Sequence, residues 1–180
     1  MAHRTMTSKT GVRRLHKASA AETNEIEIAF LLQDWDDAYN VGGMFRVADA
    51  VGAKVMYSSG KTPQVGHPQI AVTSLGHHRR VELRHFDRHE DAAKAVVDDG
   101  FALVAVEISE ECVPYQSFEY PRKVCFALGN EERGLYQAVS KKCEAAVFIP
   151  MFGKGRSLNV HVSAAVIAFH ARCAGKLRAE

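Results

Sequence analysis

The sequence predicts an α/β domain built on a parallel sheet that is covered by helices on both faces. Short apolar segments alternate with segments of helical periodicity through most of the chain. Segment 26–32 is nearly continuous in apolar character and segment 101–108 is the most apolar, as expected for strands buried on both sides. A length of 180 residues with 47% hydrophobic residues suits one domain with a single sizeable core.

The first half of the chain predicts two strands joined by a helix. We expect strands at 26–32 and 54–58, and between them a helix that Asn40 caps and Gly52 ends. One face of this helix is apolar and carries Val41, Met44, Phe45, Ala48 and Val51. Residues 59–76 are rich in Gly, Pro, Ser and Thr, which predicts a long functional loop with one short helical turn.

The second half continues the alternation of strands and helices. We expect, in order, a half-exposed strand at 80–86, a helix at 90–98, strands at 101–108 and 124–128, a helix to about residue 142, a strand at 146–149 and a long helix from about residue 157. The last helix carries apolar residues at helical spacing, namely Leu158, Val162, Ala165, Val166 and Phe169.

Basic residues form clumps although the net charge is only +2. The clumps are Arg4, Lys9, Arg13, Arg14 and Lys17, then His77, His78, Arg79, Arg80, Arg84 and Arg88, then Lys154 and Arg156. Such local patches can bind a phosphate backbone, whereas the alternative is an ordinary solvated surface. We expect residues 1–22 to form a basic, flexible arm and residues 23–180 to form the folded domain.

Composition disfavours several classes of protein. No apolar run reaches the roughly 18 residues needed to span a bilayer, and the N-terminus has no apolar signal region, so we expect a cytoplasmic protein without membrane association. The four cysteines lack CxxC spacing, which favours free thiols over a disulfide framework or a zinc site. The nine histidines include no HExxH motif, so we expect no metal site.

Three polar motifs place functional side chains near the ends of separate elements. They are Asn40–Arg46, Leu128–Leu135, and Ile149–Met151 running on to Ser157–Val160. Open α/β sheets bind ligands at the carboxyl ends of their strands, so the motifs predict one shared pocket. Taken singly, each motif also fits a plain helix cap, with Ser157 as the cap of the last helix. No dinucleotide fingerprint, P-loop or nucleophile elbow is present.

Together the three motifs resemble a known family. The segments NVGGMFRVADAVGA, FALGNEERGL and IPMFGKGRSLNVHVSAA are similar, in order and in mutual spacing, to the signature motifs of the TrmH-like (SpoU) ribose 2′-O-methyltransferases of the SPOUT class. The resemblance covers roughly residues 25–175. It implies a C-terminal deep trefoil knot, S-adenosylmethionine as the methyl donor, and a homodimer with the last helix and the first motif at its interface.

The resemblance also implies a set of site residues. Matching positions place S-adenosylmethionine against Val106, Glu107, Leu128, Gly129, Asn130, Ile149, Met151, Ser157 and Leu158. The implied catalytic set is Arg46, Asn40, Glu131, Ser157 and Asn159. Arg46 would either help to remove the hydroxyl proton or grip the neighbouring phosphate; a guanidinium pKa above about 12 favours the second role. A departure from the family pattern is His161, which stands where many relatives carry Ser.

Three functions remain open at this point. We favour methylation of an RNA ribose, with tRNA preferred over ribosomal RNA because no large RNA-binding segment accompanies the core. A non-catalytic RNA-binding module of the same fold is the second possibility. A nicotinamide-dependent enzyme is the third, and the missing dinucleotide fingerprint disfavours it.

Overall fold

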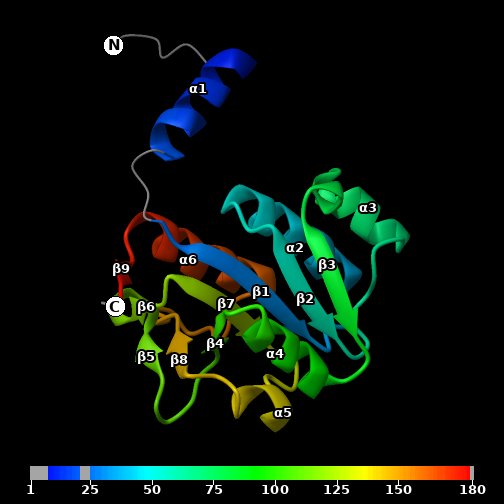
Figure 1. The fold of residues 1–180 in the computed structure, drawn as a ribbon, viewed down its shortest axis with the longest axis vertical. Helices are drawn as coiled ribbons and strands as arrows, with labels where there is room; N and C mark the ends of the chain where they lie inside the picture. The colour runs from blue at the N-terminus through cyan, green and yellow to red at the C-terminus, as the bar shows by residue number, and fades with distance from the viewer. Residues whose placement is uncertain (1–7, 21–24, 179–180) are drawn as a thin grey trace.

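A seven-stranded parallel sheet forms the centre of the molecule, as seen in the computed structural model (Figure 1). The structure describes residues 8–20 and 25–178. The strand order of the sheet is β3-β2-β1-β7-β4-β8-β5, and every neighbouring pair is parallel. The strands are β1 (Glu27–Gln33), β2 (Val55–Ser59), β3 (Glu82–Phe86), β4 (Ala102–Val106), β5 (Val113–Pro114), β7 (Lys123–Leu128) and β8 (Ala145–Phe148).

Helices connect these strands, and a second, two-stranded sheet lies beside them. The α-helices are α1 (Lys9–Ala20), α2 (Ala38–Ala50), α3 (Pro68–Ser74), α4 (His89–Asp98), α5 (Gln137–Ser140) and α6 (Val160–Cys173). Two 3-10 helices, η1 (His77–Arg79) and η2 (Tyr115–Ser117), complete the helical elements. The small sheet pairs β6 (Glu119–Tyr120) with β9 (Lys176–Leu177), so the C-terminal segment lies against the β4–β7 connection.

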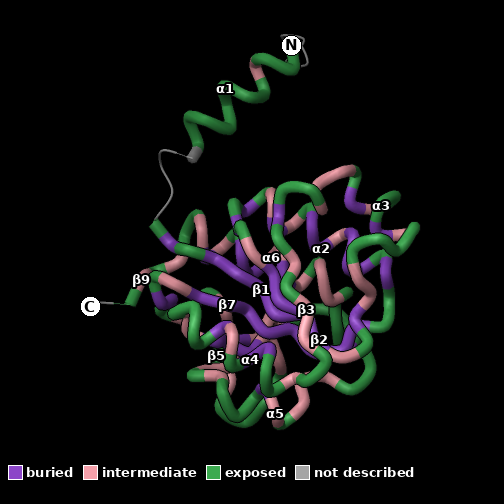
Figure 2. The backbone as a smooth tube through the Cα atoms, turned by 45° about the vertical axis from the view of Figure 1, so that its right-hand side comes forward, coloured by how far each residue is buried: buried purple, intermediate pink, exposed green. Residues whose placement is uncertain are grey.

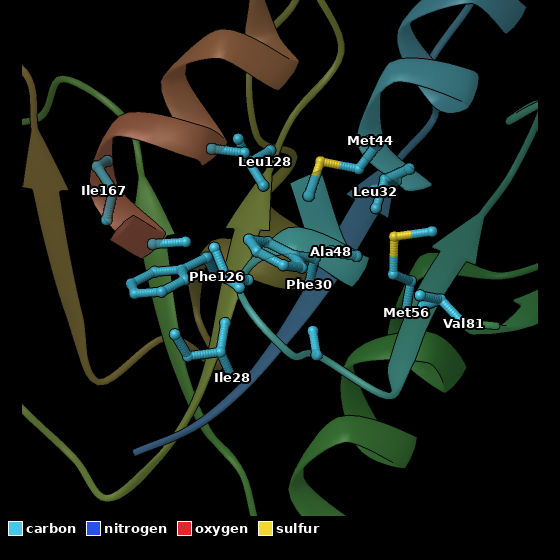
Figure 3. Packing of buried hydrophobic residues seen from close by; sticks show 14 of the residues in the cluster. Ile28, Phe30, Leu32, Met44, Ala48, Met56, Val81, Phe126, Leu128 and Ile167 are labelled. Carbon is cyan, nitrogen blue, oxygen red and sulfur yellow. The ribbon is translucent and has the colours of Figure 1, made fainter. Parts of the chain in front are cut away.

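Both faces of the main sheet are covered, as the sequence predicts. Along β1, Ile28, Phe30 and Leu32 face one apolar layer, whereas Ala29 and Leu31 face the other. The first layer is closed by α2 and α6, and Figure 3 shows side chains of both helices meeting β1 and β7 there. The second layer is closed by α4 and α5. The central strands β1, β2, β4 and β7 are therefore mostly buried, whereas the edge strand β3 is half-exposed, as the sequence predicts, and the outer helix faces are exposed (Figure 2).

The sequence patterning predicted no element before residue 26, but residues 9–20 form helix α1. Its Lys, Arg, Ala and Leu content favours a helix, whereas its apolar side chains are too few for the periodicity that marks a buried helix. Val12 and Leu15 are exposed, and Figure 1 places α1 away from the sheet. Residues 1–7, 21 and 22 of the expected arm lie outside the described residues.

The predicted helix from about 131 to 142 is wrong for most of its length. Residues 130–134 instead form a tight turn, closed by an antiparallel bridge between Asn130 and Gly134, and only the four residues of α5 are helical. Gly134 has a positive φ of 65°, which ends any helical path through it. The glutamates that suggested a helix start therefore lie in a turn.

Two predicted helix caps are also corrected. The N-cap of α2 is Asp37, whose side chain accepts a hydrogen bond from the Tyr39 amide, so Asn40 lies within the first turn of the helix. The N-cap of α6 is Asn159, not Ser157, and its Oδ1 accepts from the His161 amide. Both corrections matter for the site, because they decide which way the Asn40 and Asn159 side chains point.

The loop expected at 59–76 agrees with the structure. The expected loop at 59–76 contains one short helix, α3, whose Thr73 packs against α2 at Gly42. Among the described residues, no helix is both long and apolar enough to cross a bilayer, and no cluster of three potential metal ligands occurs. The four cysteines are free thiols.

Candidate active site

A pocket of about 510 Å³ lies at the carboxyl ends of β4, β7 and β8. This edge is where parallel sheets place their ligands, because the strand-to-helix connections open there. All nine positions for which the family resemblance implied a methyl donor line this pocket: Val106, Glu107, Leu128, Gly129, Asn130, Ile149, Met151, Ser157 and Leu158. Of the implied catalytic residues, Glu131, Ser157 and Asn159 line it, whereas Asn40 and Arg46 do not.

The turn at 129–134 forms one wall of the pocket and is held rigidly. The Asn130 amide and carbonyl both bond to Gly134, at 3.1 and 2.9 Å. Its side chain donates to the Asp34 carbonyl (2.6 Å) and to Asp36 (2.9 Å), and accepts from the amides of residues 132 and 133. Because Asn130 uses its polar groups on the protein, it shapes the wall and leaves ligand recognition to its neighbours.

Glu107 ties the end of β4 to the same turn. Its Oε2 accepts from the Leu135 amide at 3.2 Å, and its Oε1 accepts from the Ile108 amide at 3.0 Å. Gly129 lies against the end of the turn, where a Cβ would overlap backbone atoms of Gly134 and Leu135. A side chain at position 129 therefore cannot coexist with this turn, which explains the glycine at the strand end.

A chain of side-chain hydrogen bonds joins the three sequence motifs. Asn159 Nδ2 donates to Asn40 Oδ1 at 2.9 Å, and Asn40 Nδ2 donates to Glu131 Oε1 at 2.8 Å. Glu131 Oε2 also accepts from the Asp36 amide at 3.3 Å. These residues are 119 and 91 positions apart in sequence, so only the folded sheet brings them together. We refer to Asn159, Asn40 and Glu131 as the amide relay.

His161 adds a fourth member that lies beside the relay. Its Nδ1 lies 3.1 Å from Asn40 Oδ1, and its ring packs on Gly43, where a Cβ would come within 3.0 Å of the ring. Burial lowers the pKa of His161, and the positive charge of Arg46 lowers it further, while Asp37 opposes both effects. His161 is therefore a neutral imidazole at neutral pH.

Arg46 lies outside the pocket wall, on the exposed surface of α2. It makes no hydrogen bond or ion pair with the residues that the structure describes, so its guanidinium can bind an external anion. Gly43 and Arg46 are three residues apart and share one face of α2. Arg46 thus lies near the His161 ring, whose pKa its positive charge lowers.

The loop between β8 and α6 supplies the outer wall. Ser157 and Leu158 are exposed and line the pocket together with Arg156, whereas Lys154 is exposed further out. Sequence reasoning did not select Ile108, Glu132, Gly134, Phe148, Arg156, Val160 or Ser163 as site residues, although all of them line the pocket. Most of these residues adjoin the selected motifs in sequence, so extending each motif by a few positions would have predicted them.

The second basic clump is largely neutralised by acidic neighbours. His77 and Arg80 contact Asp49 at 2.8 and 3.2 Å, and Arg84 contacts Asp99 at 2.7 Å and also Glu82. This clump is a weaker phosphate-binding surface than the sequence suggested. The exposed bases of α1 and of the loop at 154–156 carry most of the unpaired positive charge that was expected to contact RNA.

The pocket residues fit S-adenosylmethionine chemically. Apolar walls from Val106, Leu128 and Ile149 suit a flat adenine ring. Carboxylates at Glu131 and Glu132 suit the positive charge of a sulfonium and an amino group. A cavity of about 510 Å³ lies within the range of roughly 300–1,000 Å³ that is usual for a ligand of this size.

Comparisons with known proteins agree with this assignment. A profile of the family described as "SpoU rRNA Methylase family" matches residues 27–169. A tRNA (guanosine(18)-2′-O)-methyltransferase of Thermus thermophilus is 31% identical over 93% of this chain and 85% of its own length. A 23S rRNA (guanosine(2553)-2′-O)-methyltransferase of Bacillus subtilis is 30% identical over 79% of this chain and 56% of its own.

A solved structure shares the fold. The AdoMet-bound rRNA methyltransferase from Sinorhizobium meliloti superposes with a TM-score of 0.75 at 25% identity, covering 81% of this chain and 55% of that chain. The chain thus spans little more than half of the Sinorhizobium and Bacillus proteins but most of the Thermus protein. The match of the family profile across the whole sheet and all three motifs shows that this chain belongs to the SpoU/TrmH family of RNA 2′-O-methyltransferases.

Proposed function

We propose that this protein transfers a methyl group from S-adenosylmethionine to a ribose 2′-hydroxyl of tRNA, and that it does so in the cytoplasm. The observation that carries the proposal is the amide relay, which joins all three family motifs at the rim of one pocket. S-adenosylmethionine supplies an electrophilic methyl group. Four free thiols are consistent with a reducing compartment.

The residues of the chain contribute by binding and orienting. The walls formed by β4, the 129–134 turn and the loop at 149–158 hold the methyl donor in one pose. The unpaired Arg46 guanidinium binds the phosphate next to the target ribose, and its charge favours the ionised form of the nearby hydroxyl. Asn40, Glu131, Ser157 and Asn159 fix the ribose relative to both groups.

We propose tRNA rather than ribosomal RNA as the substrate. The Thermus tRNA enzyme is similar over 93% of this chain and 85% of its own length, whereas the Bacillus rRNA enzyme has a large part of its length outside the match. The exposed bases Lys9, Arg13, Arg14 and Lys17 of α1 provide a short basic surface for an RNA backbone.

We further propose a homodimer and a trefoil knot. Val162, Val166 and Phe169 recur at helical spacing on α6, and Val162 and Phe169 are 40% and 44% exposed, which suits a helix that pairs with a second copy. Strand β7 lies between β1 and β4, and β9 pairs with β6, which supports a threaded C-terminus. Sedimentation velocity would give about twice the 19.8 kDa chain mass for the dimer.

A methyl-transfer assay tests the main proposal. The protein is incubated with radiolabelled S-adenosylmethionine and with separate unmodified tRNA and rRNA pools, and the RNA is then digested to nucleosides. Label in a 2′-O-methylnucleoside from tRNA supports the proposal, and label from rRNA alone would reassign the substrate. No label in either pool, together with no binding of the methyl donor by calorimetry, would refute the activity.

Arg46→Ala sharpens the assay. Because Arg46 has no partner among the described residues, its removal should leave the melting temperature and methyl-donor affinity unchanged while transfer falls at least about 100-fold. Arg88→Ala is the matched control: Arg88 is exposed and precedes α4, on the opposite face of the sheet, so transfer should be unaffected. Equal activity of the two variants would exclude a role for Arg46.

A further inference from the structure

His161 is placed against α2 in a way that requires a glycine beneath it. The ring lies on Gly43, whose missing side chain leaves the space: a Cβ there would approach Cδ2 and Nε2 of the ring at 3.0 Å. His161 is the second residue of α6, and its neighbours Val160 and Ser163 line the pocket. The ring therefore lies beside α2, next to one edge of the pocket and close enough to the exposed Arg46 to feel its charge.

The hydrogen bonds of Asn40 decide the tautomer of His161. Asn40 Nδ2 donates to Glu131, so its Oδ1 is the carbonyl oxygen and can only accept. That oxygen accepts from Asn159 and also lies 3.1 Å from His161 Nδ1. His161 must consequently carry its proton on Nδ1, which leaves a lone pair on Nε2. The structure gives Nε2 no hydrogen-bond partner among the described residues.

Two charged groups of α2 act on this ring. Arg46 disfavours protonation of His161, and Asp37, the N-cap of α2, favours it. Glu131 contacts Asn40 and not the His161 ring, and Asn159, which also contacts Asn40, is uncharged. Burial is the largest influence and lowers the pKa, so the imidazole is neutral and able to accept a proton where the enzyme works.

We infer that His161 is a catalytic residue whose Nε2 accepts the proton of the ribose 2′-hydroxyl. The inference rests on the proposed function. A phosphate held by Arg46 brings the adjacent ribose to the ring, because the 2′-hydroxyl and the 3′-phosphate sit on neighbouring carbons of one sugar. A guanidinium group stays protonated in proteins and cannot take the proton, whereas the lone pair on His161 Nε2 can.

The step balances as an in-line displacement. The 2′-oxygen forms its bond to the methyl carbon while the carbon–sulfur bond breaks and the sulfonium becomes an uncharged thioether. The hydroxyl proton moves to Nε2, so His161 becomes an imidazolium that Asn40 continues to hold through Nδ1–H. Solvent then takes up the proton and restores the neutral ring.

An NMR experiment tests the ground state without turnover. In the protein without ligands, two-bond ¹⁵N–¹H spectra should give His161 as the Nδ1–H tautomer, with a pKa below 6.5. Arg46→Gln should raise that pKa, because it removes a nearby positive charge. An Nε2–H tautomer in the wild-type protein, or a pKa above 6.5, would overturn the inference.

A kinetic experiment tests the role itself. His161→Asn keeps an amide donor near the position of Nδ1 but has no titrating group. The single-turnover rate of methyl transfer by this variant should be about 10²- to 10⁴-fold lower than that of the wild type at pH 8. The wild-type rate should fall tenfold per pH unit below the His161 pKa, whereas the rate of the variant should not show this decrease at acid pH. His170→Gln, which removes a second half-buried imidazole from α6, should keep the wild-type profile.

The outcomes separate the inference from the function on which it rests. If the wild-type protein transfers methyl groups and His161→Asn matches its rate and pH profile, His161 is not the acceptor and the proposed function stands. If methyl-donor affinity falls as much as the rate does, His161 only holds the pocket together and the inference fails. If the wild-type protein transfers nothing to any RNA and does not bind the methyl donor, both are refuted.

Discussion

Gly129→Ala tests the pocket wall most directly. Gly129 ends β7, and a Cβ there would overlap the carbonyl group of Gly134 and the amide nitrogen of Leu135. The overlap is with backbone, which cannot rotate away as a side chain could. The turn must then either tolerate the strain or separate its two sides.

Both responses have a similar energetic cost. Overpacking of this kind costs about 1–3 kcal/mol. Opening the turn breaks the two backbone hydrogen bonds between Asn130 and Gly134, at about 0.5–1.5 kcal/mol each. The smaller unfolded-state entropy of Ala offsets about 0.4–1 kcal/mol. We therefore expect the free energy of unfolding of Gly129→Ala to be lower by about 1–2 kcal/mol, which corresponds to a melting temperature lower by roughly 2–8 °C.

The methyl donor should report the same change. If ligand binding must restore the native turn, about 1–2 kcal/mol of binding free energy is lost, which weakens the dissociation constant roughly 5- to 30-fold. Differential scanning fluorimetry and isothermal titration calorimetry with S-adenosylmethionine measure the two effects. Gly153→Ala is the matched control, because no atom lies within 4 Å of its added Cβ, and it should change stability by less than about 0.5 kcal/mol.

A Gly129→Ala protein that melts and binds the methyl donor as the wild type does would refute this reasoning. It would mean that the turn at 129–134 is not held against β7 as described. Loss of affinity in Gly153→Ala as well would instead point to a general sensitivity of the outer loop.

Two further predictions concern pH and salt. Burial lowers the pKa of His170 in the folded protein, so its contribution to stability is complete above the unfolded pKa of about 6.5 and is lost as the pH falls below that value and through the lower pKa of the folded state. Chemical denaturation from pH 5 to 8 should therefore show a free energy of unfolding that falls less steeply toward acid pH for His170→Gln, and an unchanged slope would contradict this. Lys154 and Arg156 are exposed, so replacing both with Ala should weaken tRNA binding and reduce the slope of log K against log salt by roughly 1 per lost phosphate contact. Arg80→Ala, which removes a base already paired with Asp49, should change the slope less, and equal effects would indicate diffuse attraction.

Much of the fold could be predicted because apolar periodicity is a local property. The spacing of apolar residues predicts the buried faces of β1 and α2, and every apolar residue predicted for one face of α2 is buried. The prediction of a helix after β7 is wrong because the conformation of this segment depends on residues far away in the sequence. Asn130 binds Asp34 and Asp36 across 96 and 94 residues, and no local pattern reports such contacts.

The sequence by itself determined the alternation of strands and helices, the three motifs and the family to which they belong, because each depends on residue types at fixed short spacings. Only the tertiary structure decided how the motifs work together. The parallel sheet brings the ends of β4, β7 and β8 to one edge, and α2 and α6 meet there through Asn40, Asn159 and His161. The tautomer of His161 follows from those contacts, because it depends on which atom of a residue 121 positions away faces the ring.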